Sequence, residues 1–313
     1  MATVSDFMAE WHSELPYVEA HTSGSTGEPK TIRLPKADML VSARATCRFF
    51  GLGAGSVLAL PLSVDYIAGK MMAVRADVCG GRLLELPVSN AVSVPVPVDL
   101  LAVVPSQIPG LLASGTAGLV RRLLVGGAPL PDATAADLAA AGVDAWLGYG
   151  MTETCSHVAL RRVADPDAAF TAMPGITFST DTRGCLVMHS ADYSWRRLVT
   201  NDCVELLSPS TFRWLGRADH VINSGGIKIH PELLEAEIRR ALPSLPPFYI
   251  TAEPDPRWGE RPVMIAEAEI SLDPVRAAVS DRRTAPARVI AAGTLPRTSN
   301  GKLRRLPPSY FTT

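Results

Sequence analysis

Short, continuously apolar segments alternate with helical segments between residues 56 and 147, and this alternation strongly limits the folds open to the chain. The run at 56–61 (Ser-Val-Leu-Ala-Leu-Pro) precedes a helical pattern at 66–78. Further runs of this kind occupy 82–86, 99–104, 121–125 and 143–147, with more helices expected at 35–50 and 132–141. Strands that are apolar on both faces and separated by helices are typical of a covered parallel sheet. The sequence therefore predicts an α/β fold built from βαβ units.

The pattern changes after residue 157, where shorter β-like runs are separated by turns rich in Pro, Asp and Gly. These runs cover 157–162, 175–179, 185–189, 198–200 and 204–207. They predict an antiparallel β appendix to the parallel part, with Asp202 and the segment 216–219 in turns. Beyond that point we expect a small α+β domain, with a hairpin at 221–229 and a helix that begins at Pro231. The predicted domains are 1–216, a hinge at 217–219, and a mobile C-terminal domain at 220–313.

Composition argues against several classes of protein. The 313 residues are 47% apolar and 19% charged, and the formal net charge of −1 gives no reason to expect a nucleic-acid partner. No apolar run approaches the roughly 18 residues of a membrane span, and Asp6 and Glu10 make the N-terminus unlike a signal peptide. The five cysteines show no C-x-x-C pair and no metal-ligand spacing with histidine. Reduced thiols in a cytoplasmic protein are the simplest expectation.

A glycine-rich stretch at 21–30 (His-Thr-Ser-Gly-Ser-Thr-Gly-Glu-Pro-Lys) is expected to form the turn between two strands. Glycine permits positive φ, so successive N–H groups can surround an anion, and hydroxyls and Lys30 add further donors. The spacing is not that of the Walker loop. A surface loop without a ligand would have the same composition, so this stretch alone leaves both interpretations open.

Two other segments follow predicted parallel strands, where ligands usually enter such sheets. The first is Gly126-Gly127-Ala128-Pro129, which a simple tight turn would also explain. The second, residues 148–153 (Gly-Tyr-Gly-Met-Thr-Glu), offers an aromatic face for adenine, a hydroxyl for phosphate and a carboxylate for Mg²⁺. Magnesium needs few protein carboxylates when phosphate oxygens complete its shell.

Five motifs stand in one order: 22–30, 148–153, Thr-Asn-Asp at 200–202, Gly-Arg-Ala-Asp at 216–219, and Pro-Arg-Thr-Ser-Asn-Gly-Lys at 296–302. This order resembles the adenylate-forming superfamily of acyl-CoA synthetases, adenylation domains and luciferases. The resemblance implies ATP-dependent adenylation of a small carboxylic acid with Mg²⁺, followed by thioester formation with CoA. Strings at 66–72, 104–107, 148–157 and 222–232 are similar to short o-succinylbenzoate–CoA ligases of menaquinone biosynthesis, which implies that acid as substrate.

The resemblance also implies a role for each matching residue. ATP phosphates would be bound by Thr22, Ser23, Gly24, Ser25, Thr26, Gly27 and Lys30. The adenine and ribose would be bound by Gly126, Gly127, Ala128, Pro129, Gly148, Tyr149, Gly150, Asp202 and Arg217. Thr152 would touch the α-phosphate, Glu153 would hold Mg²⁺, and Lys302 would bridge carboxylate and α-phosphate. Asp219 would be the hinge, and Ser224, Gly225 and Gly226 would approach CoA.

Two departures from the family pattern are visible. Asn201 replaces the glycine of the usual Thr-Gly-Asp. The phosphate motif begins near residue 22, whereas the family places a long segment before it, so we expect a truncated large domain without most of that subdomain. Its acyl pocket would then be closed by other means, such as a partner subunit in a homo-oligomer.

Lys70 flanks an apolar stripe of the predicted helix that contains Ile67, Met71 and Val74. Such a lysine ordinarily lays its stem on apolar surface and keeps its ammonium in water. Alternatively it binds the second carboxylate of o-succinylbenzoate, since a charge in an apolar pocket needs a cation, with Ser156 and His157 as further candidates.

Two other functions remain open from the sequence. The acyl group could pass to a carrier protein or an amine, or the chain could be a nucleotide-binding protein without catalysis. The presence of both Glu153 and Lys302 favours an enzyme, because a binding module needs neither.

Overall fold

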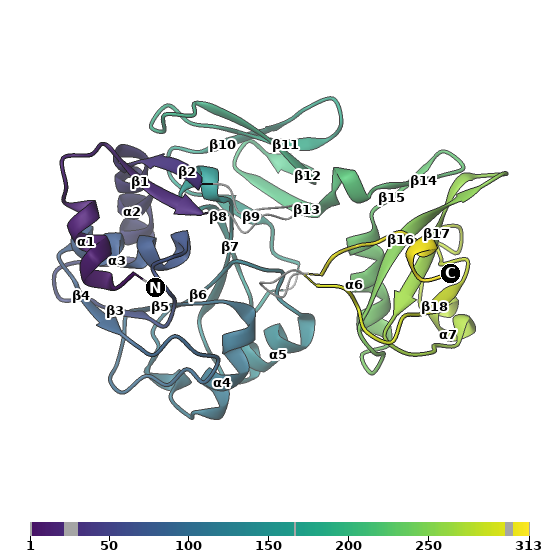
Figure 1. Cartoon of the computed structure of the whole chain (residues 1–313), viewed down its shortest axis with the longest axis horizontal. Coiled ribbons are helices and arrows are strands. Elements are labelled where there is room, and N and C mark those ends of the chain that lie inside the picture. Colours follow the sequence, from purple (N-terminus) through teal and green to yellow (C-terminus); the bar gives the residue numbers. More distant parts are fainter. Residues whose placement is uncertain (1, 22–30, 166, 298–302, 313) are drawn as a thin grey trace. The chain divides into compact units, whose positions relative to one another are not determined.

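The computed structural model describes residues 2–21, 31–165, 167–297 and 303–312 (Figure 1). The chain divides into two compact units. Unit 1 comprises Met1–Ser179, Met188–Leu198 and Leu206–Arg213, and unit 2 comprises Thr180–Val187, Val199–Glu205 and Trp214–Thr313. The hinge at 217–219 stays a prediction, since nothing in this division tests it.

The predicted parallel sheet is confirmed in unit 1. Its strands are β3 (Val57–Leu60), β4 (Arg82–Glu85), β5 (Leu100–Val103), β6 (Leu123–Val125) and β7 (Ala145–Gly150). They are ordered β4-β3-β5-β6-β7, and all neighbours are parallel. Every residue of β5 and β6 is buried. Burial on both faces explains why these strands are apolar without alternation.

The predicted helices are also present. They are α2 (Lys36–Phe50), α3 (Ile67–Cys79), the short α4 (Ile108–Ala113) and α5 (Asp132–Ala140). Helices α2 and α3 end at Gly51 (φ 65°) and Gly80 (φ 67°), which take the left-handed conformation that stops a helix. The sequence reasoning did not foresee α1 (Val4–Trp11), which begins with a capping box between Thr3 and Asp6. In Figure 1 it lies beside α3.

The antiparallel appendix is confirmed too. It contains β8 (His157–Arg162), β9 (Phe170–Ala172), β10 (Thr177–Thr180), β11 (Cys185–His189), β12 (Arg197–Ser208) and β13 (Thr211–Arg217). With the parallel strands they form one sheet in the order β10-β11-β12-β13-β9-β8-β7-β6-β5-β3-β4.

One detail of the appendix was predicted wrongly. The expected strands at 198–200 and 204–207 are a single strand, β12, that runs through Asp202, and Arg217 ends β13 rather than lying in a turn. Asn201 and Asp202 are residues typical of turns, but here both make side-chain bonds to other segments. Arg183 Nη1 donates to Asn201 Oδ1 (3.0 Å), and Trp214 Nε1 donates to Asp202 Oδ1 (3.1 Å). These bonds replace the local ones that favour a turn.

A separate two-stranded sheet flanks the glycine-rich stretch. Its strands β1 (Tyr17–His21) and β2 (Thr31–Pro35) are antiparallel, with His21 opposite Thr31. The predicted strand–turn–strand arrangement is therefore confirmed for both strands, while residues 22–30 lie outside the described residues.

The part of unit 2 that follows residue 219 has the expected α+β structure. Its main sheet has the order β15 (Ile227–Ile229), β14 (Ile222–Ser224), β17 (Gly259–Ala266), β16 (Phe248–Asp255), with β18 (Val289–Ala291) parallel to β17. Helix α6 (Pro231–Ala241) buries Leu234 and Ile238 in the core of this unit, and Leu242 packs against it. Helix α7 (Leu272–Ala277) and the 3₁₀ turns η4 (Ala218–His220) and η5 (Pro308–Tyr310) complete it. Across the described residues of both units, no helix is long and apolar enough to cross a membrane.

Candidate active site

The carboxyl ends of β6 and β7 bring the two predicted adenine segments together in unit 1. Val125 lies opposite Leu147, so Gly126 and Gly148 follow at neighbouring positions of the sheet edge. Residues 127–129 are exposed, and Gly127 has a φ of 84°. The edge thus offers exposed backbone where ligands of α/β proteins usually bind, while the adenine role of these residues stays a prediction.

Packing also requires glycine at 150 and leaves little room for a side chain at 148. A Cβ atom at Gly150 would collide with the backbone of Ser156, and one at Gly148 would lie 3.1 Å from His157 Cβ. Tyr149 between them packs its ring against Phe212 (5.1 Å between centroids) and Phe170 (5.7 Å). These glycines therefore let β8 approach β7, whatever else they contact.

The turn after β7, η3 (Thr152–Thr154), presents the predicted magnesium ligand. The buried Thr154 hydroxyl accepts from Met151 N (3.0 Å) and lies 2.7 Å from Ser156 O, which holds the turn closed. Thr152 is half-buried and Glu153 is exposed. Among the described residues, no group of three acidic, His or Cys side chains is placed so that it could hold a metal ion. A single exposed carboxylate fits Mg²⁺ only if the ion also binds phosphate oxygens, as the sequence predicts.

Beneath this turn, a continuous hydrogen-bonded chain of side chains crosses unit 1. Arg75 Nη2 bonds Ser156 Oγ, which lies 3.2 Å from His157 Nδ1, and His157 Nε2 lies 3.1 Å from Thr46 Oγ1. The Thr46 hydroxyl donates its one proton to Ser42 O (3.0 Å). It must therefore accept from the histidine, which places the proton on Nε2 and makes Nδ1 the acceptor for Ser156.

Electrostatics agree with a neutral histidine in this chain. Burial, and then the charge of Arg75, hold the pKa of His157 well below its usual range. Burial also lowers the pKa of Arg75, to about 10. Arg75 is only 2% exposed, its Nε has no hydrogen-bond partner, and no described carboxylate forms an ion pair with it. A buried cation without a counter-charge is costly unless an anion joins it.

Lys70, in contrast, already has partners. Its ammonium lies 3.4 Å from Glu10 Oε2 and 4.4 Å from the centre of the Phe7 ring, and the residue is 6% exposed. A substrate carboxylate would have to compete with Glu10 for it. The role predicted for Lys70 stays a prediction. Of the other two predicted substrate residues, Ser156 bonds Arg75 directly and His157 bonds Ser156.

Unit 2 brings together three other predicted residues. Arg217 lies 3.9 Å from Asp202 Oδ1, and its Nε donates to Asp219 Oδ1 (3.0 Å). The predicted ribose pair and the predicted hinge are therefore in one cluster of side chains. Burial alone would raise the pKa of Asp219, but the hydrogen bond from Arg217 and its charge hold that pKa below the usual value.

The predicted CoA segment forms the turn between β14 and β15. Gly225 and Gly226 take φ of 56° and 84°, so the turn needs glycine. Trp258 packs over Gly225, since a Cβ there would lie 2.6 Å from the indole ring. The tryptophan is 47% exposed, and the guanidinium of Arg257 lies 4.5 Å from its ring. An exposed aromatic ring and a cation thus adjoin the turn.

Several predicted residues fall outside the described part of the chain, namely the seven phosphate residues of 22–30 and Lys302. The structure does show Arg297 bridged to Leu303, on either side of the segment that contains Lys302. Sequence reasoning missed Arg75 and Trp258. Arg75 was detectable as a lone cation in the apolar run of 71–76, and Trp258 as a tryptophan in a polar turn.

Comparison with known protein families identifies the class of protein to which this fold belongs. The model of the AMP-binding enzyme family matches residues 6–184, more than half of the chain, and the chain belongs to that family.

Its relatives include the 2-succinylbenzoate–CoA ligase of Salmonella typhimurium, which is 27% identical over 79% of this chain and 57% of its own length. The 4-coumarate–CoA ligase of Rhodobacter capsulatus is 30% identical over 83% of this chain and 70% of its own. The chain therefore spans little more than half the length of the Salmonella typhimurium ligase.

Among solved structures, the o-succinylbenzoate CoA synthetase of Bacillus subtilis in complex with ATP and magnesium superposes with a TM-score of 0.75. It covers 91% of this chain and 68% of its own, at 19% identity. At that identity the likeness establishes the shared fold.

Proposed function

We propose that the protein is an AMP-forming acid–CoA ligase. A carboxylate oxygen attacks the α-phosphorus of ATP and pyrophosphate leaves; the CoA thiol then attacks the acyl carbon and AMP leaves. Membership of the AMP-binding enzyme family and two relatives named CoA ligases support this reaction. Mg²⁺ held by Glu153 would offset phosphate charge, and Lys30 and Lys302 would add cations around the reacting groups.

The acid we propose is o-succinylbenzoate, and Arg75 is the observation that carries this choice. The relatives' names alone point both to this diacid and to the monoacid 4-coumarate. A diacid keeps one carboxylate after the other is adenylated, and that charge must be neutralised in the site. Arg75 is a buried cation that lacks a carboxylate among the described residues and already bonds Ser156. Lys70, paired with Glu10, is the second candidate.

The test is ATP–pyrophosphate exchange with o-succinylbenzoate, 4-coumarate and a long-chain fatty acid. We expect exchange with the diacid at least about tenfold faster than with either monoacid, a difference of about 1.4 kcal/mol. Equal rates would refute the diacid assignment and leave a general acid–CoA ligase. ATP binding without exchange for any acid would instead favour a non-catalytic nucleotide-binding protein.

For the acceptor we propose CoA, on the evidence of the glycine turn at Gly225 and Gly226. Trp258 already covers Gly225, but a Cβ atom at Gly226 would meet nothing within 4 Å, so a narrow pantetheine arm has room at Gly226. The Trp258 ring and the Arg257 cation lie beside this turn. Analysis of the product distinguishes a CoA thioester from an acylated carrier protein or an amide. The same proposal includes a place in menaquinone biosynthesis and a cytoplasmic location. It also includes a homo-oligomer in which a partner subunit closes the acyl pocket.

A further inference from the structure

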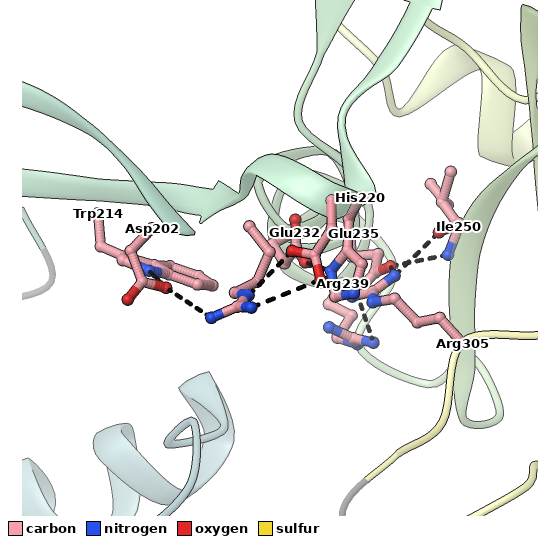
Figure 2. Close-up of polar contacts among 10 residues, drawn as sticks. Asp202, Trp214, His220, Glu232, Glu235, Arg239, Ile250 and Arg305 are labelled. Atoms are coloured by element: carbon pink, nitrogen blue, oxygen red, sulfur yellow. Dashed lines mark hydrogen bonds and ion pairs between the residues drawn. The ribbon is translucent and has the colours of Figure 1, made fainter. Parts of the chain in front are cut away.

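Glu232 on α6 contacts three separate segments of unit 2. Its Oε1 lies 2.5 Å from His220 Nδ1 and 3.6 Å from Arg305 Nη2 (Figure 2). On the other side, a Cβ atom at Gly216 would collide with its Oε2. Burial would raise the pKa of Glu232, but the bond from His220 and the charge of Arg305 bring it below its usual value. The carboxylate is therefore ionised and enclosed.

Two of these contacts lie on either side of the predicted hinge. Gly216 precedes residues 217–219, and His220 follows them at the end of η4. A rotation of the backbone at 217–219 changes the distance between Gly216 and His220. Because one carboxylate makes both contacts, Glu232 cannot keep both when that distance changes, and one of the two packed contacts must rearrange.

The third contact connects Glu232 with the C-terminal segment. Arg305 forms a two-pronged ion pair with Glu235, with 2.9 Å between Nη2 and Oε2, and also donates to Ile250 O (2.9 Å). Next to it, Arg304 N donates to Pro296 O (2.8 Å), and Leu306 N donates to Tyr249 Oη (3.1 Å). The backbone that directly follows Lys302 in sequence is thus anchored by Arg305 and its neighbours.

We propose that Glu232 is a positioning residue that couples the predicted hinge to the C-terminal segment 303–306, and so sets the balance between the two half-reactions. This proposal rests on the proposed function and adds a residue to it. Among the described residues, Glu235 bonds to α6, β16 and the C-terminal segment alone, so its role is to stabilise the unit. Glu232 alone of the two carboxylates also touches both sides of residues 217–219.

The test compares Glu232→Gln with Glu253→Gln. Glu253 is a matched control because its side chain is 11% exposed, against 12% for Glu232, and it is likewise ion-paired in unit 2, with Arg261 and Arg288 at 2.6 Å. Within the described residues, none of its hydrogen bonds or ion pairs involves residues 216–220 or 303–306. We expect Glu232→Gln to lower kcat of pyrophosphate exchange roughly tenfold or more, as misplacement of a reacting group does. KM for ATP and acid should stay within about threefold, and conversion of preformed acyl-adenylate with CoA within about twofold. Equal losses in both half-reactions, or the same split in Glu253→Gln, would overturn the proposal.

A second variant, His220→Leu, removes the other end of the contact and should give the same split. Both changes break the same contact between His220 and Glu232, so the double variant should be no slower than the slower single variant. A rate loss equal to the product of the two single losses would contradict the coupling.

Hydrogen exchange provides a readout without activity. Glu232→Gln should speed exchange at the amides of Arg304 and Leu306, and Glu253→Gln should not. Unchanged exchange in Glu232→Gln overturns the coupling. If the parent shows no ATP–pyrophosphate exchange, the proposed function is refuted. If amide hydrogen exchange is nevertheless faster in Glu232→Gln, the structural coupling still holds.

Discussion

Thr46 and His157 are joined by a hydrogen bond of 3.1 Å although 111 residues separate them in the sequence. The bond uses the Nε2 proton of a neutral imidazole, and Nδ1 accepts from Ser156. A second ring proton would take away the acceptor of the Ser156 hydroxyl proton and would add a positive charge beside the buried guanidinium of Arg75. The network therefore favours an uncharged histidine.

Stability should consequently fall in acid. An unfolded histidine titrates near pH 6.5, and burial lowers the pKa of His157 in the folded protein. Above about pH 7 both states are neutral and the full stability is present. Below about pH 6.5 only the unfolded state takes up the proton, so stability is lost by up to about 1.4 kcal/mol per pH unit until the folded pKa is reached. Urea unfolding should show that the free energy of unfolding falls more between pH 7.5 and 5.5 in the parent than in His157→Gln. Identical falls would exclude His157 as the cause of the acid sensitivity.

Arg75→Met should separate binding from stability. Removing a buried cation without a counter-ion should leave the urea midpoint unchanged or raise it. The same change should raise KM for o-succinylbenzoate by at least about thirtyfold, about 2 kcal/mol, and leave KM for ATP within about twofold. Lys70→Met serves as the comparison, because it also removes a buried cation. If Lys70→Met raises this KM and Arg75→Met does not, Lys70 is the carboxylate ligand.

Trp258→Ala should weaken CoA without affecting adenylation. The ring lies on the glycine turn and half of it faces solvent, so it offers apolar surface to an incoming thiol arm. We expect KM for CoA to rise about tenfold, about 1.4 kcal/mol, with pyrophosphate exchange unchanged. Trp258→Phe should restore most of the affinity. A normal KM for CoA in the alanine variant would place CoA elsewhere.

Lys302→Ala should affect the first half-reaction. Loss of a transition-state cation should reduce pyrophosphate exchange by roughly 10²-fold or more. Conversion of preformed acyl-adenylate with CoA should continue at nearly the parent rate, measured by thioester formation. Equal reductions in the two assays would remove Lys302 from the adenylation step.

The sequence by itself determined the elements whose cause is local. The apolar runs that became β3, β5 and β6, the helices α2 and α3 with their glycine stops, and the Gly225-Gly226 hairpin all follow from periodicity and backbone freedom. The order of the five motifs was also sufficient to indicate the family. Where polar residues suggested a turn at Asp202, local reasoning failed, because the carboxylate bonds Trp214 on another strand.

Tertiary structure alone decided which charges are paired. Lys70 meets Glu10 from a helix that was not predicted, and Arg75 meets Ser156 and remains without a carboxylate among the described residues. Glu232 likewise joins His220 and Arg305, which are far apart along the chain. Periodicity reports which face of an element is buried, but not which side chain of another element lies opposite. The energy of a buried charge depends on that partner, so the chemistry of Arg75 and Glu232 became visible only in the folded chain.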